Sequence, residues 1–251
     1  MVTTFYLTQR LLQIAMQQLQ QLGNSTWPAM SEIFYDENRE GFSERIVDVT
    51  EFIAFASGAL LSVLVIVNPK FVVLWTGAQT FAGLTLSHIV VINSGVIAIS
   101  SFWIWCFTGT GGIALTLPML ACQAGTNLLI SVLGTYYLGL VGPALGTLIS
   151  FLFVTQPWTT YLLHREFQVP VLPLTRAWIV PLLLPVSLTI LGSSYWGVPT
   201  MNTWPLLIFW SLVFSVLALA LFPLIFVRAR SRMKIYSRVN ETFISKLGLK
   251  K

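Results

Sequence analysis

The chain has 251 residues, of which 55% are hydrophobic and only 9% are charged. An average soluble domain carries about 25% charged residues, so this composition, with a mean hydropathy of +0.78, excludes an ordinary soluble domain. The formal net charge is +5. Most of the excess basic residues follow Val227, where they suit topology anchoring or contact with anionic membrane lipids, and no nucleic-acid partner is needed to explain them.

Long apolar stretches, separated by short polar breaks, run through the whole chain. A hydrocarbon core of about 30 Å needs about 20 apolar residues per helix. We therefore predict an all-α fold, a polytopic membrane helical bundle of about seven transmembrane helices in a single transmembrane domain over residues 1–251. The predicted spans are 3–30, 50–75, 79–106, 111–134, 138–163, 177–196 and 203–227, with a basic tail at 228–251.

Most lysines and arginines fall on one side of these predicted spans. A cytoplasmic C-terminus satisfies the positive-inside rule and places these residues inside: Arg39, Arg45, Arg165, Arg176, Arg228, Arg230, Arg232, Lys234, Arg238, Lys246, Lys250 and Lys251. The N-terminus is then outside, although no signal-peptide pattern precedes the first span. We therefore expect the chain to be part of a longer one that also has an N-terminal half.

The polar breaks and the prolines suggest where the helices are irregular. The charged loop at 35–45 becomes amphipathic from Phe42, which predicts a short helix on the cytoplasmic surface, with a solvated connector as the alternative. Four prolines fall inside predicted spans, where proline removes a backbone donor and kinks a helix. They are Pro118, Pro181, Pro185 and Pro223.

The first predicted span has an unusual polar stripe. On a helix of 100° per residue its polar side chains fall within an arc of about 120°. They are Gln9, Arg10, Gln13, Gln17, Gln20, Gln21 and Asn24. Unpaired amides cannot face lipid cheaply, so we predict that this stripe lines a water-filled cavity.

Two ionisable residues stand out within the predicted spans. Arg10 suits an anionic group such as a phosphate, because a guanidinium offers paired donors; its alternative role is snorkelling to the outer interface. His88 falls near the middle of the predicted third span and is the candidate for ion coupling, with a buried helix contact as the alternative. Gly142, Gly146 and Ser150 repeat every four residues, which predicts close helix packing.

Other chemistry has little support in the sequence. Cys106 and Cys122 lie in or beside spans, show no disulfide or metal-ligand spacing, and are expected to pack. His88 and His164 share no ligand motif. No P-loop, HExxH or nucleophile-elbow motif occurs. We therefore expect no enzyme, no cofactor and no metal site.

Several segments together carry a resemblance to a known family. They are residues 5–11 (FYLTQRL), 27–31 (WPAMS), 74–77 (LWTG), 127–131 (NLLIS) and 138–150 (LGLVGPALGTLIS). In this order they resemble the C-terminal half of bacterial polysaccharide biosynthesis proteins of the O-antigen flippase type. That family belongs to the multidrug, oligosaccharidyl-lipid and polysaccharide exporter superfamily. The resemblance covers most of residues 3–165, whereas the predicted terminal helix pair at 177–227 agrees only in hydropathy.

The resemblance implies a fold of about 12 to 14 helices in two related bundles around a central cavity, of which this chain is the second. It implies a flippase that moves undecaprenyl-diphosphate-linked oligosaccharide across the bacterial inner membrane for surface polysaccharide biosynthesis. The family has no universal motif for the substrate site, so Arg10 and the glutamine stripe remain the candidates. A small-molecule or drug exporter of the same superfamily and a non-transporting scaffold or fragment are the alternatives.

Overall fold

The computed structural model describes residues 2–35, 39–195, 197 and 199–226, and these residues form helices and no strand. The α-helices are α1 (Val2–Asn24), α2 (Trp27–Tyr35), α3 (Arg39–Thr76), α4 (Leu84–Gly109), α5 (Leu117–Leu138), α6 (Gly142–Ser150), α7 (Gln156–Phe167), α8 (Val171–Trp178), α9 (Leu184–Tyr195) and α10 (Trp204–Phe226). Short 3₁₀ segments are η1 (Ala78–Thr80), η2 (Ile113–Thr116) and η3 (Gly139–Val141), and π-helical segments are η4 (Phe151–Thr155) and η5 (Ile179–Leu183). The all-α prediction is confirmed for this part of the chain.

The predicted count of seven spans is not supported. Among the described residues, four helical segments are long and apolar enough to cross a membrane. They are Glu40–Thr76, Leu84–Gly109, Ile113–Phe167 and Val171–Tyr195. The predicted first span does not qualify because α1 is rich in glutamine and the helix is interrupted before Trp27. The predicted last span corresponds to the apolar stretch Trp204–Ala218 of α10, which is shorter, and the predicted tail at 228–251 lies outside the described residues.

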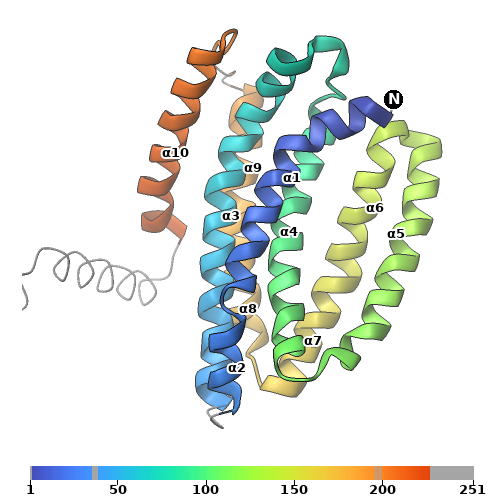
Figure 1. The fold of residues 1–251 in the computed structure, drawn as a ribbon, viewed down its shortest axis with the longest axis vertical. Coiled ribbons are helices and arrows are strands. Elements are labelled where there is room, and N and C mark those ends of the chain that lie inside the picture. The colour runs from blue at the N-terminus through green and yellow to red at the C-terminus, as the bar shows by residue number, and fades with distance from the viewer. Residues whose placement is uncertain (1, 36–38, 196, 198, 227–251) are drawn as a thin grey trace, which may run out of the picture.

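The predicted fourth and fifth spans belong to one helical segment, Ile113–Phe167, that folds back on itself. Its 55 residues would extend about 80 Å as a straight helix, far more than a bilayer core of about 30 Å. The reversal occurs at Gly139, whose φ of 59° is a left-handed conformation that favours glycine. Consequently α5 and the α6–α7 arm lie side by side as a hairpin (Figure 1).

Small residues set the close approach of this hairpin. A Cβ built on Gly142 would lie 2.2 Å from the backbone nitrogen of Thr135 and 2.3 Å from the carbonyl carbon of Gly134. A Cβ on Gly146 would lie 2.2 Å from Oγ of Ser131. Ser150 is buried and its Oγ accepts a hydrogen bond from Nε2 of Gln123 at 3.3 Å. The residues of the predicted small-residue stripe therefore all face α5.

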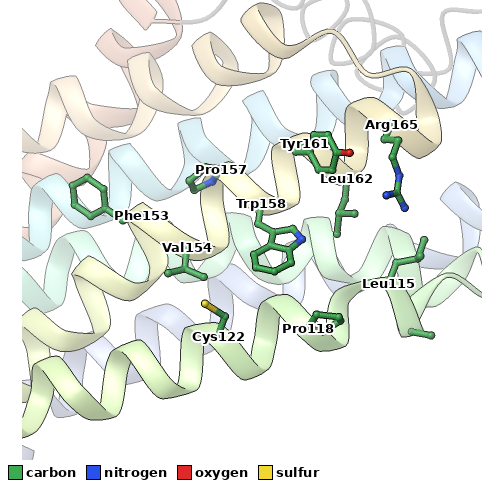
Figure 2. A pocket seen from close by; sticks show the side chains of 11 residues that line it. Leu115, Pro118, Cys122, Phe153, Val154, Pro157, Trp158, Tyr161, Leu162 and Arg165 are labelled. Carbon is green, nitrogen blue, oxygen red and sulfur yellow. The ribbon is translucent and has the colours of Figure 1, made fainter.

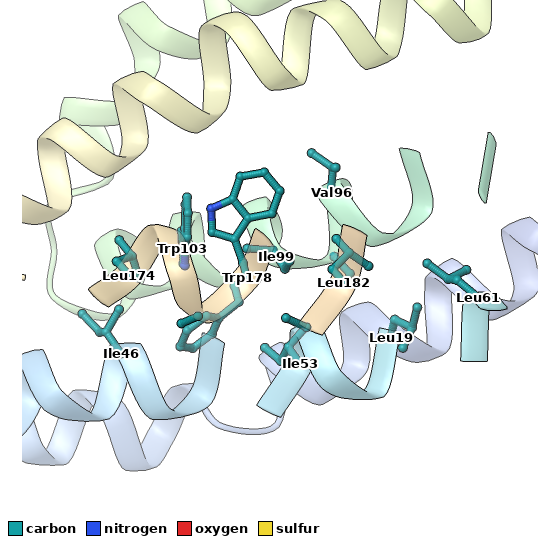
Figure 3. Close-up of a cluster of buried hydrophobic side chains, with 14 of the residues drawn as sticks. Leu19, Ile46, Ile53, Leu61, Val96, Ile99, Trp103, Leu174, Trp178 and Leu182 are labelled. Carbon is teal, nitrogen blue, oxygen red and sulfur yellow. The ribbon is translucent and has the colours of Figure 1, made fainter. Parts of the chain in front are cut away.

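The main core lies where α1, α3, α4, α8 and η5 meet (Figure 3). Its buried members include Leu12 of α1, Ile53 of α3 and Trp103 of α4, with Trp178 and Leu182 from the α8–η5 segment. The indole Nε1 of Trp103 donates to Oγ1 of Thr50 at 2.9 Å, which satisfies a polar group inside the apolar cluster. In contrast, α5 turns a face with Leu128, Val132 and Tyr136 outward, and these side chains are 68%, 61% and 83% exposed.

The charged loop is followed by a different structure from the one predicted. Instead of a short surface helix, residues from Arg39 onward form one continuous helix with the span, because Phe42 is buried. The ring of Phe42 lies 5.2 Å from that of Phe34 and 5.0 Å from that of Phe167. These contacts join α2, α3 and α7 at the end of the bundle where α2 and the α7–α8 junction lie (Figure 1).

Three of the four prolines predicted inside spans lie in helical segments of span length, Pro118 in Ile113–Phe167 and Pro181 and Pro185 in Val171–Tyr195. Pro118 lies in the first turn of α5, where a missing backbone donor costs little, and Pro185 directly follows η5 at the start of α9. Pro181 lies in η5, the π-helical break between α8 and α9. Pro223 lies within α10. The predictions omitted Pro69, which lies inside α3.

Candidate functional site: the polar face of α1

The polar stripe predicted for the first span lies along one side of α1. The opposite side of the helix carries Leu12, Ala15 and Leu19, which are buried against α3 and α4. Exposed polar side chains are those of Arg10, Gln17 and Gln21, and half-buried ones are those of Gln9, Gln13, Gln20 and Asn24. We call these seven residues the polar face of α1. In Figure 1, α1 lies in front of α3 and α4, on the side away from α9.

Hydrogen bonds tie only part of the polar face to the rest of the protein. Nε2 of Gln20 donates to Oγ of Ser101 on α4 at 3.0 Å, and Nε2 of Gln13 donates to Oε1 of Gln9 on the same helix at 3.2 Å. The side-chain oxygen Oδ1 of Asn24 is buried without a hydrogen-bond partner. The edge nearest α4 is therefore anchored, while the rest of the face has unused donors and acceptors.

The exposure of the polar face has a clear energetic meaning. An amide that faces hydrocarbon without a partner costs several kcal/mol, and a charge at the centre of a membrane helix costs about 2.5–3.5 kcal/mol on insertion scales. Arg10, Gln17 and Gln21 nevertheless lie on the outer side of a helix that packs on apolar neighbours. At membrane depth this face needs water or a polar partner.

The structure does not bring His88 to the polar face of α1. The helix α4 begins at Leu84, because residues 77–83 form a turn with positive φ at Gly77 and Gly83. His88 thus lies about 6 Å from the start of its helix, and the prediction that it lies near mid-span is wrong. It lines a pocket formed by α3, α4 and α9.

A buried polar junction near this pocket was missed by the sequence analysis. Nδ2 of Asn68 donates to the backbone oxygen of Thr8 at 3.1 Å and to Oγ of Ser87 at 2.9 Å. Oγ1 of Thr8 in turn accepts from the backbone nitrogen of Ala82 at 2.9 Å. The junction joins α1, α3 and α4. The Asn68-Pro69 dipeptide inside an apolar span was the signal that could have revealed it.

A second missed group of polar residues joins α4 to the hairpin. Nδ2 of Asn93 donates to the backbone oxygen of Ala144 at 2.9 Å, and Nε2 of Gln156 donates to Oγ of Ser100 at 3.0 Å. These residues are buried and satisfied on their donor side, so their geometry is that of helix-to-helix contacts.

A second pocket lies between the start of α5 and α7 (Figure 2). It has a volume of about 740 Å³ and is lined mainly by apolar and aromatic side chains, including Cys122 and Trp158. The guanidinium of Arg165 at its end already pairs with the carboxylate of Glu166 at 2.6 Å and lies 5.8 Å from the ring centre of Tyr161. This pocket is therefore an apolar surface, and the positive charge of Arg165 at its end is neutralised by Glu166.

Charge is distributed unevenly along the bundle. The described acidic residues lie in α2, in the first half of α3 and at Glu166. All of these positions are toward the end of the bundle that contains the α7–α8 junction. Arg10 lies in the first half of α1 and Lys70 near the C-terminal end of α3. Within the described ranges, no group of three histidine, cysteine or acidic side chains is placed to hold a metal ion.

Comparisons with known proteins add no identification. No protein-family model matches the chain, and neither a curated protein nor a solved structure matches it. Functional inference therefore rests on the residues and their geometry.

Proposed function

We propose that this chain is one helical bundle of a membrane transporter of the flippase type, which moves a lipid-diphosphate-linked oligosaccharide across a bacterial inner membrane. The observation that carries the proposal is the exposed polar face of α1 on an otherwise apolar bundle. Such a face is stable at membrane depth when it borders a hydrated cavity. The other wall of that cavity is a second helical bundle, on the same polypeptide or on another chain.

The chemistry of the polar face fits a glycan with a diphosphate group. Amide side chains both donate and accept, as the hydroxyls of a sugar do. The guanidinium of Arg10 offers paired N–H donors to phosphate oxygens. Since Arg10 is exposed and has no carboxylate partner among the described residues, its charge is open to an anionic substrate. The lipid tail of the substrate stays in the bilayer while its head group crosses through the cavity.

Thiol labelling tests whether the polar face borders water. Gln17→Cys on α1 is compared with Leu128→Cys, an exposed position on the apolar outer face of α5. Both are made in a Cys122→Ala background, since Cys122 is the exposed native thiol and Cys106 is buried. In membranes, a charged maleimide that cannot cross lipid should modify Gln17→Cys at least tenfold faster than Leu128→Cys. Equal rates would remove the hydrated cavity from the proposal.

Complementation tests the transport activity. A bacterium that lacks its O-antigen flippase receives this chain alone, or together with the first helical bundle of the missing flippase, and lipopolysaccharide banding is scored on a gel. The proposal predicts that banding is restored, that Arg10→Ala abolishes it and that Arg176→Ala leaves it intact. Arg176 is the control because it is an exposed arginine on α8, at the far end of the bundle. Absence of banding with every protein present in the membrane would count against glycan transport.

A further inference from the structure

The pocket that contains His88 is lined by residues of α3, α4 and α9 and of the turn before α4, and its described lining includes no residue of α1. Its volume is about 420 Å³, within the range of small-molecule sites. Its polar side chains are Lys70 from α3, His88 from α4, and Ser193 and Ser194 from α9. Two consecutive helices and the distant helix α9 therefore bring two basic groups and two hydroxyls together.

The basic groups of this pocket have no acidic neighbour. Within the described part of the chain, Lys70 forms no salt bridge. The nearest acidic residue before it on α3 is Glu51, 19 positions earlier and thus about 28 Å away along the helix. That distance is several times the Debye length of about 8 Å at physiological ionic strength. The positive charge of Lys70 is consequently not cancelled by any described acidic residue of its own helix.

The remaining polar atoms in the pocket are acceptors. The hydroxyls of Ser193 and Ser194 both donate to the backbone oxygen of Ile190, at 2.9 Å each, so their oxygens keep lone pairs for another donor. Pro69 also lines the pocket and has no N–H for the carbonyl of Val65, one turn earlier on α3. The pocket thus combines the ammonium of Lys70 and the imidazole of His88 with acceptors that suit hydroxyl groups.

The pocket lies near one end of α3 and one end of α4. Lys70 lies six residues before the end of α3 and His88 four residues after the start of α4. At 1.5 Å per residue these positions are about 9 Å and 6 Å from the helix ends. The first turn of α4 also contributes, because Leu84 lines the pocket and a helix N-terminus carries partial positive charge.

We propose that this pocket binds the phosphate group of a hydroxyl-bearing phosphate ester, with Lys70 and His88 on the phosphate and the hydroxyl oxygens of Ser193 and Ser194 on the alcohol. Two sources have this chemistry: the head group of an anionic phospholipid such as phosphatidylglycerol, and a soluble molecule such as glycerol phosphate. The site is separate from the polar face of α1, and the inference does not depend on the proposed transport function.

The test measures binding to the purified full-length chain in detergent after delipidation, with bound molecules counted by native mass spectrometry. Phosphatidylglycerol, phosphatidylcholine and glycerol phosphate are titrated separately. We expect one phosphatidylglycerol to bind at least tenfold more tightly than phosphatidylcholine, and Lys70→Gln to weaken it about tenfold, as for loss of a charge-assisted hydrogen bond. Arg176→Gln removes an exposed charge from α8 and should leave binding unchanged.

The outcomes separate the two sources and can overturn the site. Binding of phosphatidylglycerol without glycerol phosphate assigns the site to a lipid, while comparable binding of both assigns it to the phosphate ester itself. Equal affinities for the two lipids, or equal losses in Lys70→Gln and Arg176→Gln, would refute the inference. A measurement on the wild-type chain avoids the possibility that a variant misfolds. Phosphatidylglycerol should lower the rate at which an amine reagent acylates Lys70, but not the rate for the lysines in residues 228–251.

Discussion

The substitution Gly142→Ala tests the hairpin that α5 forms with α6. A Cβ at this position would lie 2.2 Å from the backbone nitrogen of Thr135 and 2.3 Å from the carbonyl carbon of Gly134, whereas ordinary contacts begin at 3.4 Å. The two helices would have to separate by about 1.2 Å to admit one methyl group. Since both obstructing atoms belong to the backbone, no change of side-chain rotamer relieves the overlap.

The expected cost follows from this geometry. Overpacking in a well-packed interior costs about 1–3 kcal/mol, and the upper part of that range applies because the backbone itself must move. Gly125→Ala is the matched control, since it lies in the middle of α5 with nothing within 4 Å of the added Cβ. It should stabilise the helix by up to about 1 kcal/mol. The two variants should therefore differ by about 3–4 kcal/mol in free energy of unfolding.

Reversible unfolding in mixed micelles of a mild detergent and sodium dodecyl sulfate measures this difference, with helicity followed by circular dichroism. Gly142→Ala should unfold at a lower fraction of dodecyl sulfate than the wild-type chain, and Gly125→Ala at the same or a higher fraction. If both variants unfold together, the close approach of α5 and α6 does not exist in the folded protein and the reasoning fails.

Three further predictions concern buried groups. Thr50→Val should lower the free energy of unfolding by about 1–3 kcal/mol in the same micelle assay, because it leaves the buried indole N–H of Trp103 without an acceptor; an unchanged midpoint would contradict this. Asn68→Leu should lower the free energy of unfolding by about 2 kcal/mol, since the substitution removes two buried hydrogen bonds that join α3 to α1 and α4. Unchanged stability of this variant would show that the junction is dispensable. N-ethylmaleimide should label exposed Cys122 in the folded chain and buried Cys106 only after unfolding. Peptide mass mapping identifies the labelled residue, and labelling of Cys106 in the folded chain would place it outside the core.

Much of the local architecture could be predicted from the sequence, because it depends on short-range chemistry. The amphipathic pattern of α1 placed Leu12 and Leu19 on one side and Gln17 and Gln21 on the other, and burial follows that division. The sequence predicts one span ending at residue 134 and the next beginning at residue 138, and the chain does reverse beside this boundary, at Gly139. Residue type is decisive in both cases, since amides avoid apolar contacts and positive φ favours glycine.

Other features could not be predicted because membrane helices lack a strong directional signal. Helices α4 and α10 are mainly apolar and have no separate apolar and polar faces, so their sequences do not indicate which face packs on a neighbour. Counting apolar stretches likewise gave seven spans, whereas four helical segments qualify in the described residues, one of them bent into a hairpin. The distance between His88 and α1 depends on where α4 begins, which the turn at residues 77–83 determines.

The sequence by itself determined that this protein is helical and apolar, and that one helix carries a polar stripe with a single arginine, because composition and periodicity act within one helix. Only the tertiary structure decided that Asn68 joins α1 to α4 and that Lys70 and His88 share a pocket with α9. These groupings depend on which helix faces pack together. That choice depends on contacts between residues far apart in the chain, such as those between Gly58 and Pro181.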